Sequence, residues 1–352
     1  MKVRQVLTSS IFTLLLAGAA HAQTTSFLSG TSWSNGTWSN GVPMANSNAI
    51  IGQPGALVFF DAAASPSLSS LTINGTTEAR FLHPVNNLTA TNVTVGDTDF
   101  GRYEQSGGLL TATTLTVGNT GSGVYVQTGG SLVVTGNSPL SHLIIGAGNG
   151  GIGRFELSTG ASVTANAIHV GGGLTSADAV SSGTFVQNGG TVNVTGGVGE
   201  LVVGDTSGTS GLYEMKGGTL TSKQLYVGVK GSNPVSGERA FAQSGGTVTV
   251  SENLVLGGYF GGTATPAGKF TLTGTETSIL NTSKVWVGLS GSGTFTQEGG
   301  VHNVSLGNAV GDRSLLIAAG QAGSEGVYNM KSGVLNAEGI YVGNPGKGTL
   351  NH

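Results

Sequence analysis

The chain has 352 residues and a net charge of −3; only 9% of its residues are charged, and 63 are glycine. So few charges, with 38% hydrophobic residues, exclude a charge-rich disordered chain and leave no basic stripe for nucleic acid. The absence of cysteine excludes disulfides, thiolate zinc sites and thiol catalysis, and the glycines lack the every-third period of collagen.

Residues 1–22 have the pattern of a secretory signal. Lys2 and Arg4 precede an apolar run from Val6 to Ala20, and Ala20-His21-Ala22 is a small-x-small cleavage site. The run is short for a bilayer-spanning helix, and no later stretch reaches about 18 continuous apolar residues. The sequence therefore predicts a cleaved signal peptide, export of the chain that follows it, and no transmembrane segment.

Residues 23–69 carry a different pattern from the rest of the chain. Trp33 and Trp38 lie close together, Pro43 follows, and Asn48-Ala-Ile-Ile51 is a short β-type run. We expect this segment to form an N-terminal cap and the first β segments, because the ends of repeat proteins need capping.

A repeat fills residues 70–352, and its last copy is incomplete. Each unit reads Gly, any residue, aromatic, any residue, Gln or Leu or Met, any residue, Gly-Gly, and then a β-rich run that closes in Val-Gly or a close variant. The spacing between successive aromatic residues runs from 22 to 33. These aromatic anchors are Tyr103, Tyr125, Phe155, Phe185, Tyr213, Phe241, Phe270, Phe295 and Tyr328.

The composition of each unit predicts an all-β fold. Val, Ile, Thr and aromatic residues favour strands, and the glycine pairs supply the corners. A unit of this length cannot bury a core alone, whereas stacked units can, with each strand pairing to the one above it. We therefore predict a parallel β-solenoid of about 10–11 coils, with the aromatic anchors in its interior. Phe155, Tyr213, Phe270 and Tyr328 are 58, 57 and 58 residues apart, which suggests duplication of a two-unit block.

The position two residues after each aromatic anchor lies on the same face of the strand. In some units Leu or Met occupies this position, which indicates that this face of the strand points into the interior. In the other units the position is a glutamine: Gln105, Gln127, Gln187, Gln243 and Gln297. A buried amide needs hydrogen-bond partners. Two kinds remain open: backbone groups at the corners, or contacts along the stack.

A second periodic position yields the candidate surface-binding row. His169, Tyr226, Trp286 and Tyr341 occupy the variable position of the closing Leu-x-Val-Gly segment or its variants. If the flanking aliphatic residues point inward, these rings point outward, where they could stack on sugars or partners. The alternative is that they pack sideways against loops of longer neighbouring units.

We predict no catalytic, cofactor-binding or metal-binding residues. Asp97-Thr-Asp99 is the densest acidic pair, and turn chemistry explains it better than a calcium loop does. Glu104, Glu156 and Glu214 fall on the outward face, but no two adjacent full repeats carry acids there. The Thr-x-Thr pairs at 247–249 and 271–273 leave an ice- or mineral-binding face as a minor alternative.

The repeat resembles the one shared by type V autotransporter passengers and PEP-CTERM-associated exported proteins. The resemblance implies a right-handed parallel β-helix, displayed on or shed from a Gram-negative cell, with no catalytic residues. Such proteins end in a membrane barrel or a Pro-Glu-Pro sorting tail, whereas this chain stops inside a repeat at Gly348–His352. We expect either a fragment or an unusual anchoring mode, with an unpaired edge that favours self-association.

These observations favour an exported structural or adhesive surface protein without catalytic activity. It would present a repetitive surface to glycans, extracellular matrix or other cells, on the outer membrane or outside the cell. The alternative is a polysaccharide-active β-helix enzyme, a lyase or glycoside hydrolase, which would need acidic and basic side chains converging from adjacent coils.

Overall fold

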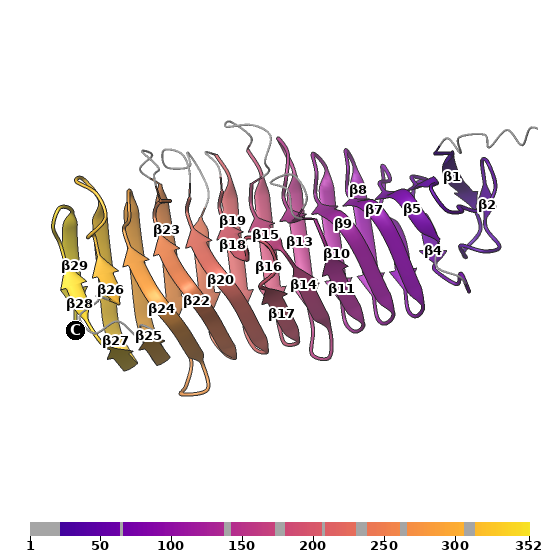
Figure 1. The fold of residues 1–352 in the computed structure, drawn as a ribbon. Helices are drawn as coiled ribbons and strands as arrows, with labels where there is room; N and C mark the ends of the chain where they lie inside the picture. The colour runs from indigo at the N-terminus through magenta and orange to yellow at the C-terminus, as the bar shows by residue number, and fades with distance from the viewer. Residues whose placement is uncertain are drawn as a thin grey trace, which may run out of the picture.

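The computed structural model describes residues 22–63, 66–136, 142–172, 180–205, 208–229, 238–260, 266–305 and 314–352. In these residues the chain is 60% strand with no helix, and its 29 strands form one long stack of coils (Figure 1). The fold is therefore an all-β, parallel β-solenoid. Residues 1–21 of the predicted signal lie outside the described residues.

Each coil contributes to up to three parallel stacks, in which every strand pairs with the equivalent strand of the coils before and after it. The first, which we call the aromatic stack, consists of β4 (Leu57–Phe59), β6 (Ala79–His83), β8 (Phe100–Gln105), β10 (Ser122–Gln127), β13 (Ile152–Leu157), β16 (Ser182–Gln187), β19 (Ser210–Met215), β21 (Arg239–Gln243), β23 (Ala267–Leu272), the first parts of β25 (Ser292–Val304) and β27 (Glu325–Ala337), and β29 (Lys347–Asn351).

The middle stack follows the glycine corner. It consists of the first parts of β5 (Ser67–Ile73), β7 (Asn87–Val95) and β9 (Leu109–Val117), then β11 (Ser131–Val134), β14 (Ser162–Ala165), β17 (Thr191–Val194), the first parts of β20 (Thr219–Val227), β22 (Thr247–Leu256) and β24 (Ile279–Val287), and the second parts of β25 and β27.

The closing stack contains the segments that end in glycine. It consists of β1 (Thr24–Ser29), β3 (Asn48–Ile51), the second parts of β5, β7 and β9, then β12 (Leu143–Ile145), β15 (Ala167–Val170), β18 (Glu200–Val203), the second parts of β20, β22 and β24, and finally β26 (Leu315–Ile317) and β28 (Ile340–Val342). A short strand, β2 (Thr37–Trp38), pairs antiparallel with β1.

The N-terminal segment both joins and closes the stacks. β3 pairs in parallel with β5, and β4 with β6, so residues before 70 already follow the solenoid register. Trp33 is 1% exposed, and its ring packs edge-on against Trp38 at 4.9 Å and Phe81 at 5.9 Å. These rings cover the first end of the aromatic column in the core.

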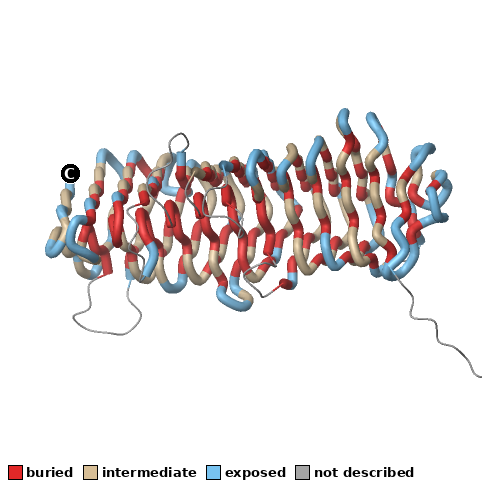
Figure 2. Tube along the Cα trace, turned by 90° about the horizontal axis from the view of Figure 1, so that it is seen from above, coloured by how far each residue is buried: buried red, intermediate tan, exposed pale blue. Residues whose placement is uncertain are grey.

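That column consists of the nine aromatic anchors, all fully buried. From Tyr103 to Tyr328 each ring lies nearly parallel to the next, with ring centroids 4.6–4.9 Å apart. This spacing follows from the strand spacing of about 4.8 Å, because residue-for-residue register places equivalent side chains directly above each other. Figure 2 shows the resulting pattern, in which buried positions alternate along each coil and exposed residues gather at corners and ends.

The buried glutamines use both kinds of partner that the sequence leaves open. Gln187 donates from Nε2 to the corner carbonyl of Gly190 at 3.3 Å and to the carbonyl of Thr219, one coil on, at 3.0 Å. Its Oε1 accepts the hydroxyl of Tyr213 in that next coil at 2.7 Å. The amide thus ties its own corner to the neighbouring coil. Gln105 and Gln297 make the same contacts, with Tyr125 and Tyr328 as hydroxyl donors.

Where the next coil carries phenylalanine instead, the glutamine oxygen has no partner. Oε1 of Gln127 faces the coil of Phe155, and Oε1 of Gln243 faces the coil of Phe270; both oxygens are buried and unbonded. A buried acceptor left unsatisfied costs about 1–3 kcal/mol. Phe155→Tyr should therefore raise the free energy of unfolding by about 1 kcal/mol, and Tyr213→Phe should lower it by about 1–3 kcal/mol.

Urea unfolding of the purified protein measures both effects. Phe185→Tyr is the matched control, because the preceding coil carries Leu157 at its glutamine position and offers the new hydroxyl no acceptor there. Equal effects of Phe155→Tyr and Phe185→Tyr would contradict the assignment of Gln127 as an acceptor in need of a donor.

The closing glycine of each coil adopts a left-handed backbone. Its φ lies between 67° and 77° at Gly96, Gly118, Gly146, Gly171, Gly204, Gly228, Gly257, Gly288 and Gly343. The chain turns sharply there and brings the following strand onto the aromatic stack. In one coil Ala318 replaces this glycine and keeps a φ of 51°, a conformation that strains an L-residue.

Candidate functional site

The closing stack presents two outward rows, which together we call the outer strip. The polar row runs Glu200, Gln224, Asn253, Lys284 through successive coils. The ring row runs Ile144, His169, Val202, Tyr226, Val255, Trp286, Leu316 and Tyr341. All four residues of the candidate surface-binding row thus lie in one line, in alternating coils from His169 to Trp286 and separated by aliphatic residues.

Exposure along this line differs from the expectation of outward-facing free rings. His169 and Tyr226 are buried, at 4% and 3% exposure, while Trp286 and Tyr341 are half-buried. Asp205 and Tyr259, which follow closing glycines, fold back against His169 and Tyr226, so the lateral packing considered as the alternative holds for these two residues. Val202, Tyr226, Val229, Val255 and Leu289 form an apolar cluster outside the solenoid core, with Trp286 packed against it.

The same fold-back presents two rings that the sequence reasoning missed. Tyr259 and Phe260 directly follow Gly257-Gly258 and are 39% and 41% exposed. Tyr259 lies 5.3 Å from the ring of Tyr226, and Phe260 meets Trp286 edge-on at 5.6 Å. An aromatic pair in a corner that is otherwise glycine and polar residues is the signal that could have found them. We call Tyr226, Tyr259, Phe260 and Trp286 the aromatic patch.

Polar groups flank the aromatic patch. Gln224, Asn253 and Lys284 are half-exposed, and Nζ of Lys284 lies 5.1 Å above the ring of Trp286. The hydroxyl of Tyr226 donates to Oε1 of Gln224. Aromatic faces next to amide and ammonium donors form the combination that binds sugars, because a sugar ring has an apolar face and a hydroxylated rim.

An ionic cluster at the N-terminal half of the outer strip joins four buried residues, His142, His169, Asp205 and Arg239, to the half-buried Glu200. The rings of His142 and His169 stack at 5.1 Å. His169 lies 3.3 Å from Oδ2 of Asp205 through Nδ1 and 3.7 Å from Oε1 of Glu200 through Nε2. Burial opposes protonation of His169, but the hydrogen bond to Asp205 and the pairing with Glu200 outweigh it and raise its pKa to about 9.

Local departures from the repeat make room for this cluster. Arg239 stands where the aligned strand has Gly211, and its stem lies over Gly204, where a Cβ would meet Arg239 Cγ at 2.4 Å. Nε of Arg239 donates to the carbonyl of Thr209 at 3.2 Å. Burial lowers the pKa of Arg239, and the charge of Asp205 counteracts that effect. An arginine at a glycine position of the repeat was the sequence signal for this cluster, and the sequence reasoning did not use it.

The titration of His169 gives stability a definite pH dependence. Because its pKa rises from 6.5 to about 9 on folding, it stabilises the fold fully below pH 6.5, and that contribution is lost as pH rises through 9. The shift corresponds to about 3 kcal/mol. Burial lowers the pKa of His83 to about 4, so its contribution is present above pH 6.5 and lost as pH falls toward 4.

Thermal unfolding across this pH range should therefore show losses on both sides of neutrality. His169→Gln should flatten the alkaline loss and leave the acid loss, whereas His83→Gln should reduce the acid loss and leave the alkaline loss. Burial lowers the pKa of His302 to about 3, so this residue should supply acid loss that remains in His83→Gln. An alkaline loss of the same size in His169→Gln and the parent chain would contradict the ionic assignment.

No cluster of three or more potential metal ligands occurs among the residues that the structure describes. The acidic pair considered for calcium bonds to the corners of neighbouring coils: Oδ1 of Asp97 accepts from Asn119 at 2.7 Å, and Oδ2 of Asp99 accepts from Asn74 at 3.4 Å. The outward acids also have ionic partners, since Glu104 pairs with Arg102, Glu156 with Arg154 and Glu214 with Lys216.

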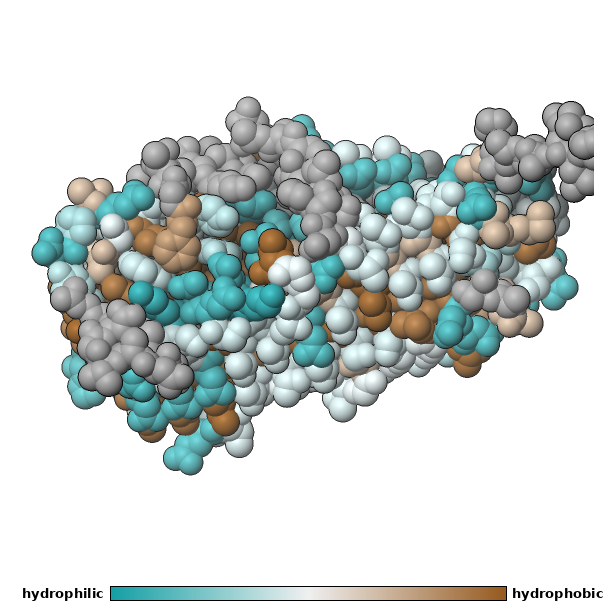
Figure 3. All heavy atoms as spheres, in the orientation of Figure 1, coloured by the Kyte–Doolittle hydropathy of each residue, from teal (hydrophilic) through white to brown (hydrophobic). Residues whose placement is uncertain are grey.

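The outward face of the middle stack has a different character. In its central coils it presents Ser162, Thr164, Thr191, Asn193, Thr219, Thr221, Thr247 and Thr249 in two aligned rows. Thr271, from the second Thr-x-Thr pair, lies on the aromatic stack instead, so the two pairs do not share a face. On the side of the rod shown in Figure 3, apolar residues form small patches among pale, weakly polar ones.

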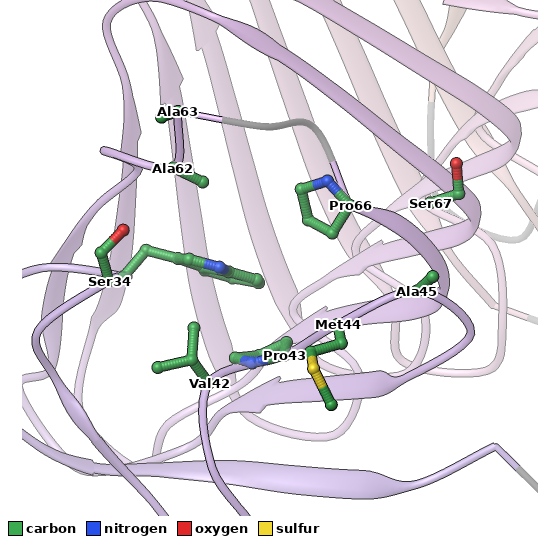
Figure 4. A pocket seen from close by; sticks show the side chains of 10 residues that line it. Ser34, Val42, Pro43, Met44, Ala45, Ala62, Ala63, Pro66 and Ser67 are labelled. Atoms are coloured by element: carbon green, nitrogen blue, oxygen red, sulfur yellow. The ribbon is translucent and has the colours of Figure 1, made fainter.

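A pocket of about 440 Å³ opens beside the N-terminal cap (Figure 4). Val42, Pro43, Met44 and Ala62 line it next to Trp33. Met44 is 67% exposed. None of the described lining residues has an ionisable side chain, so this pocket suits an apolar contact rather than chemistry.

No family model, no curated protein and no solved structure matches this chain. In the described part of the chain no helix has the length and apolar character needed to cross a bilayer.

Proposed function

We propose that this protein is an exported adhesive rod, similar to the passengers of autotransporters and PEP-CTERM-associated proteins, that acts by binding rather than by catalysis. Its place is the outer surface of a Gram-negative cell or the surrounding medium. The observation that carries the proposal is the outer strip, where half-buried Trp286 and Tyr341 stand in alternating coils of a regular solenoid. The hydrogen-bonding groups of Gln224, Asn253 and Lys284 stand beside them in successive coils. Its ligands would be glycans, matrix or neighbouring cell surfaces.

The distribution of charge supports binding over catalysis. In the ionic cluster, His169, Asp205 and Arg239 are each at most 4% exposed and are engaged with one another or with backbone. The outward rows of the central middle stack are hydroxyl and amide groups without charge. A long neutral surface of this kind favours contact over a large area.

Retention of particles measures the proposed function directly. Beads coated with residues 23–352 should be held by immobilised glycans, matrix proteins or whole cells, and beads coated with the urea-unfolded chain should not. Equal retention of the two bead types, or retention on none of these surfaces, would overturn the proposal.

One observation favours an enzyme as the second candidate. Glu200, Asp205 and His169 converge from adjacent coils, which a polysaccharide lyase or glycoside hydrolase would require. Release of reducing ends or unsaturated products from a polysaccharide panel, abolished by Glu200→Gln, would establish it. If no polysaccharide of the panel releases such products, the enzyme candidate is rejected.

A further inference from the structure

We infer that the aromatic patch and the polar row beside it form a binding site for an uncharged polysaccharide, with the sugar chain lying along the axis of the rod. The inference rests on the proposed function and names the ligand class and the residues that recognise it.

The first support is the arrangement of the rings. Tyr259 and Phe260 leave the closing stack together and are 39% and 41% exposed, whereas the rings beneath them, Tyr226 and Trp286, are buried and half-buried. Packing against the lower rings at 5.3 and 5.6 Å holds the two exposed rings in place. Preorganised aromatic surface binds at low entropic cost and matches the apolar face of a sugar ring.

The second support is the spacing of the hydrogen-bonding groups. Gln224, Asn253 and Lys284 align residue for residue in β20, β22 and β24. Successive strands place one such group about every 4.8 Å along the rod. This regular step along the axis fits a polymer of repeating sugar rings better than a compact ligand.

The third support is the balance of charge. Glu200 precedes Lys284 in the polar row. Burial raises the pKa of Tyr226, and the charges of Glu200 and Glu252 raise it further, so both carboxylates lie near this ring. Carboxylates at this position would repel a polyanion, and the single ammonium of Lys284 lies over Trp286. Uncharged sugars avoid the repulsion and still use every donor of the row.

Titration calorimetry of residues 23–352 against soluble neutral glucans, mannans and xylans, with polygalacturonate as the acidic comparison, tests the inference. At least one neutral polymer should bind, and the double variant Tyr259→Ala with Phe260→Ala should weaken it at least about tenfold, as the loss of two stacked rings predicts. Phe59→Ala is the matched control, because Phe59 is 43% exposed but lies in β4 at the far end of the rod.

Tryptophan fluorescence gives an independent readout. Trp33 and Trp38 are buried in the cap, so a change of emission on adding the polymer should come from Trp286 and disappear in Trp286→Phe. Circular dichroism of each variant shows that the solenoid remains folded. Binding of polygalacturonate alone, no binding by any polymer, or equal losses in the double variant and in Phe59→Ala would each overturn the inference.

The bead assay separates this inference from the proposed function. If beads carrying the Tyr259 and Phe260 double variant adhere as well as the parent, the polysaccharide site is wrong and the adhesive rod stands. If neither adheres, the proposed function fails first.

Discussion

Replacement of Phe185 by alanine should lower the free energy of unfolding by about 3–5 kcal/mol. Phe185 is fully buried in the middle of the aromatic column, with ring centroids 4.7 Å from Phe155 and 4.6 Å from Tyr213. Removing the ring leaves a cavity that the stacked neighbours cannot fill, because the strands above and below hold them in register.

Urea unfolding followed by circular dichroism measures this loss. Phe59→Ala serves as the control and should change stability by less than about 0.5 kcal/mol, because that ring is exposed. A loss below about 1 kcal/mol for Phe185→Ala would contradict the inference that the aromatic column contributes strongly to the free energy of unfolding. The solenoid also behaves as a line of neighbouring units, so the variant should broaden the transition as the two halves of the rod uncouple.

Gly171→Ala should be the second most damaging change. At φ 71° an alanine costs about 1–3 kcal/mol, and its Cβ would lie 1.8 Å from the backbone oxygen of Ser210 in a neighbouring coil. Both effects act at the corner that passes the chain from the closing stack to the aromatic stack. We expect a loss of at least about 2 kcal/mol.

One corner of the natural sequence already has alanine in place of the closing glycine, so the opposite substitution can be tested there. Ala318 occupies the equivalent corner at a φ of 51°, so Ala318→Gly should raise stability by about 1 kcal/mol. Thermal unfolding of both variants beside the parent decides the matter. If Ala318→Gly destabilises the chain, or if Gly171→Ala is neutral, the corner conformation does not limit stability as inferred.

The sequence could predict the solenoid because every level of the repeat points to the same structure. The aromatic, glutamine and closing-glycine positions recur together, so a single register satisfies burial, corner geometry and strand pairing at once. The nine anchors lie at 0% exposure in one column as a consequence. The sequence did not decide whether the buried glutamines bond to corner backbone or to a neighbouring coil. The hydroxyl that donates to Gln187 belongs to the next coil, and only atomic positions show this contact.

The candidate site was harder to predict because it lies where the repeat departs from itself. Burial of His169 and Tyr226 depends on Asp205 and Tyr259, which lie at the corners of later coils, and strand periodicity does not describe such corners. Tyr259, Phe260 and Arg239 each occur once, at positions where the repeat has small or polar residues. Periodicity therefore places the residues that recur in every unit, but it does not place residues that occur in one unit only.

Strict register between coils of unequal length has a consequence for how such a gene can change. Phe155, Tyr213, Phe270 and Tyr328 are spaced 58, 57 and 58 residues apart, while strand pairing in the aromatic stack stays residue for residue across all of them. Recombination between equivalent corners would remove or add a two-coil cassette without disturbing the cross-section of the rod. Each such event would alter its reach by about 10 Å, so related strains should differ in rod length by whole cassettes while conserving the profile of every coil.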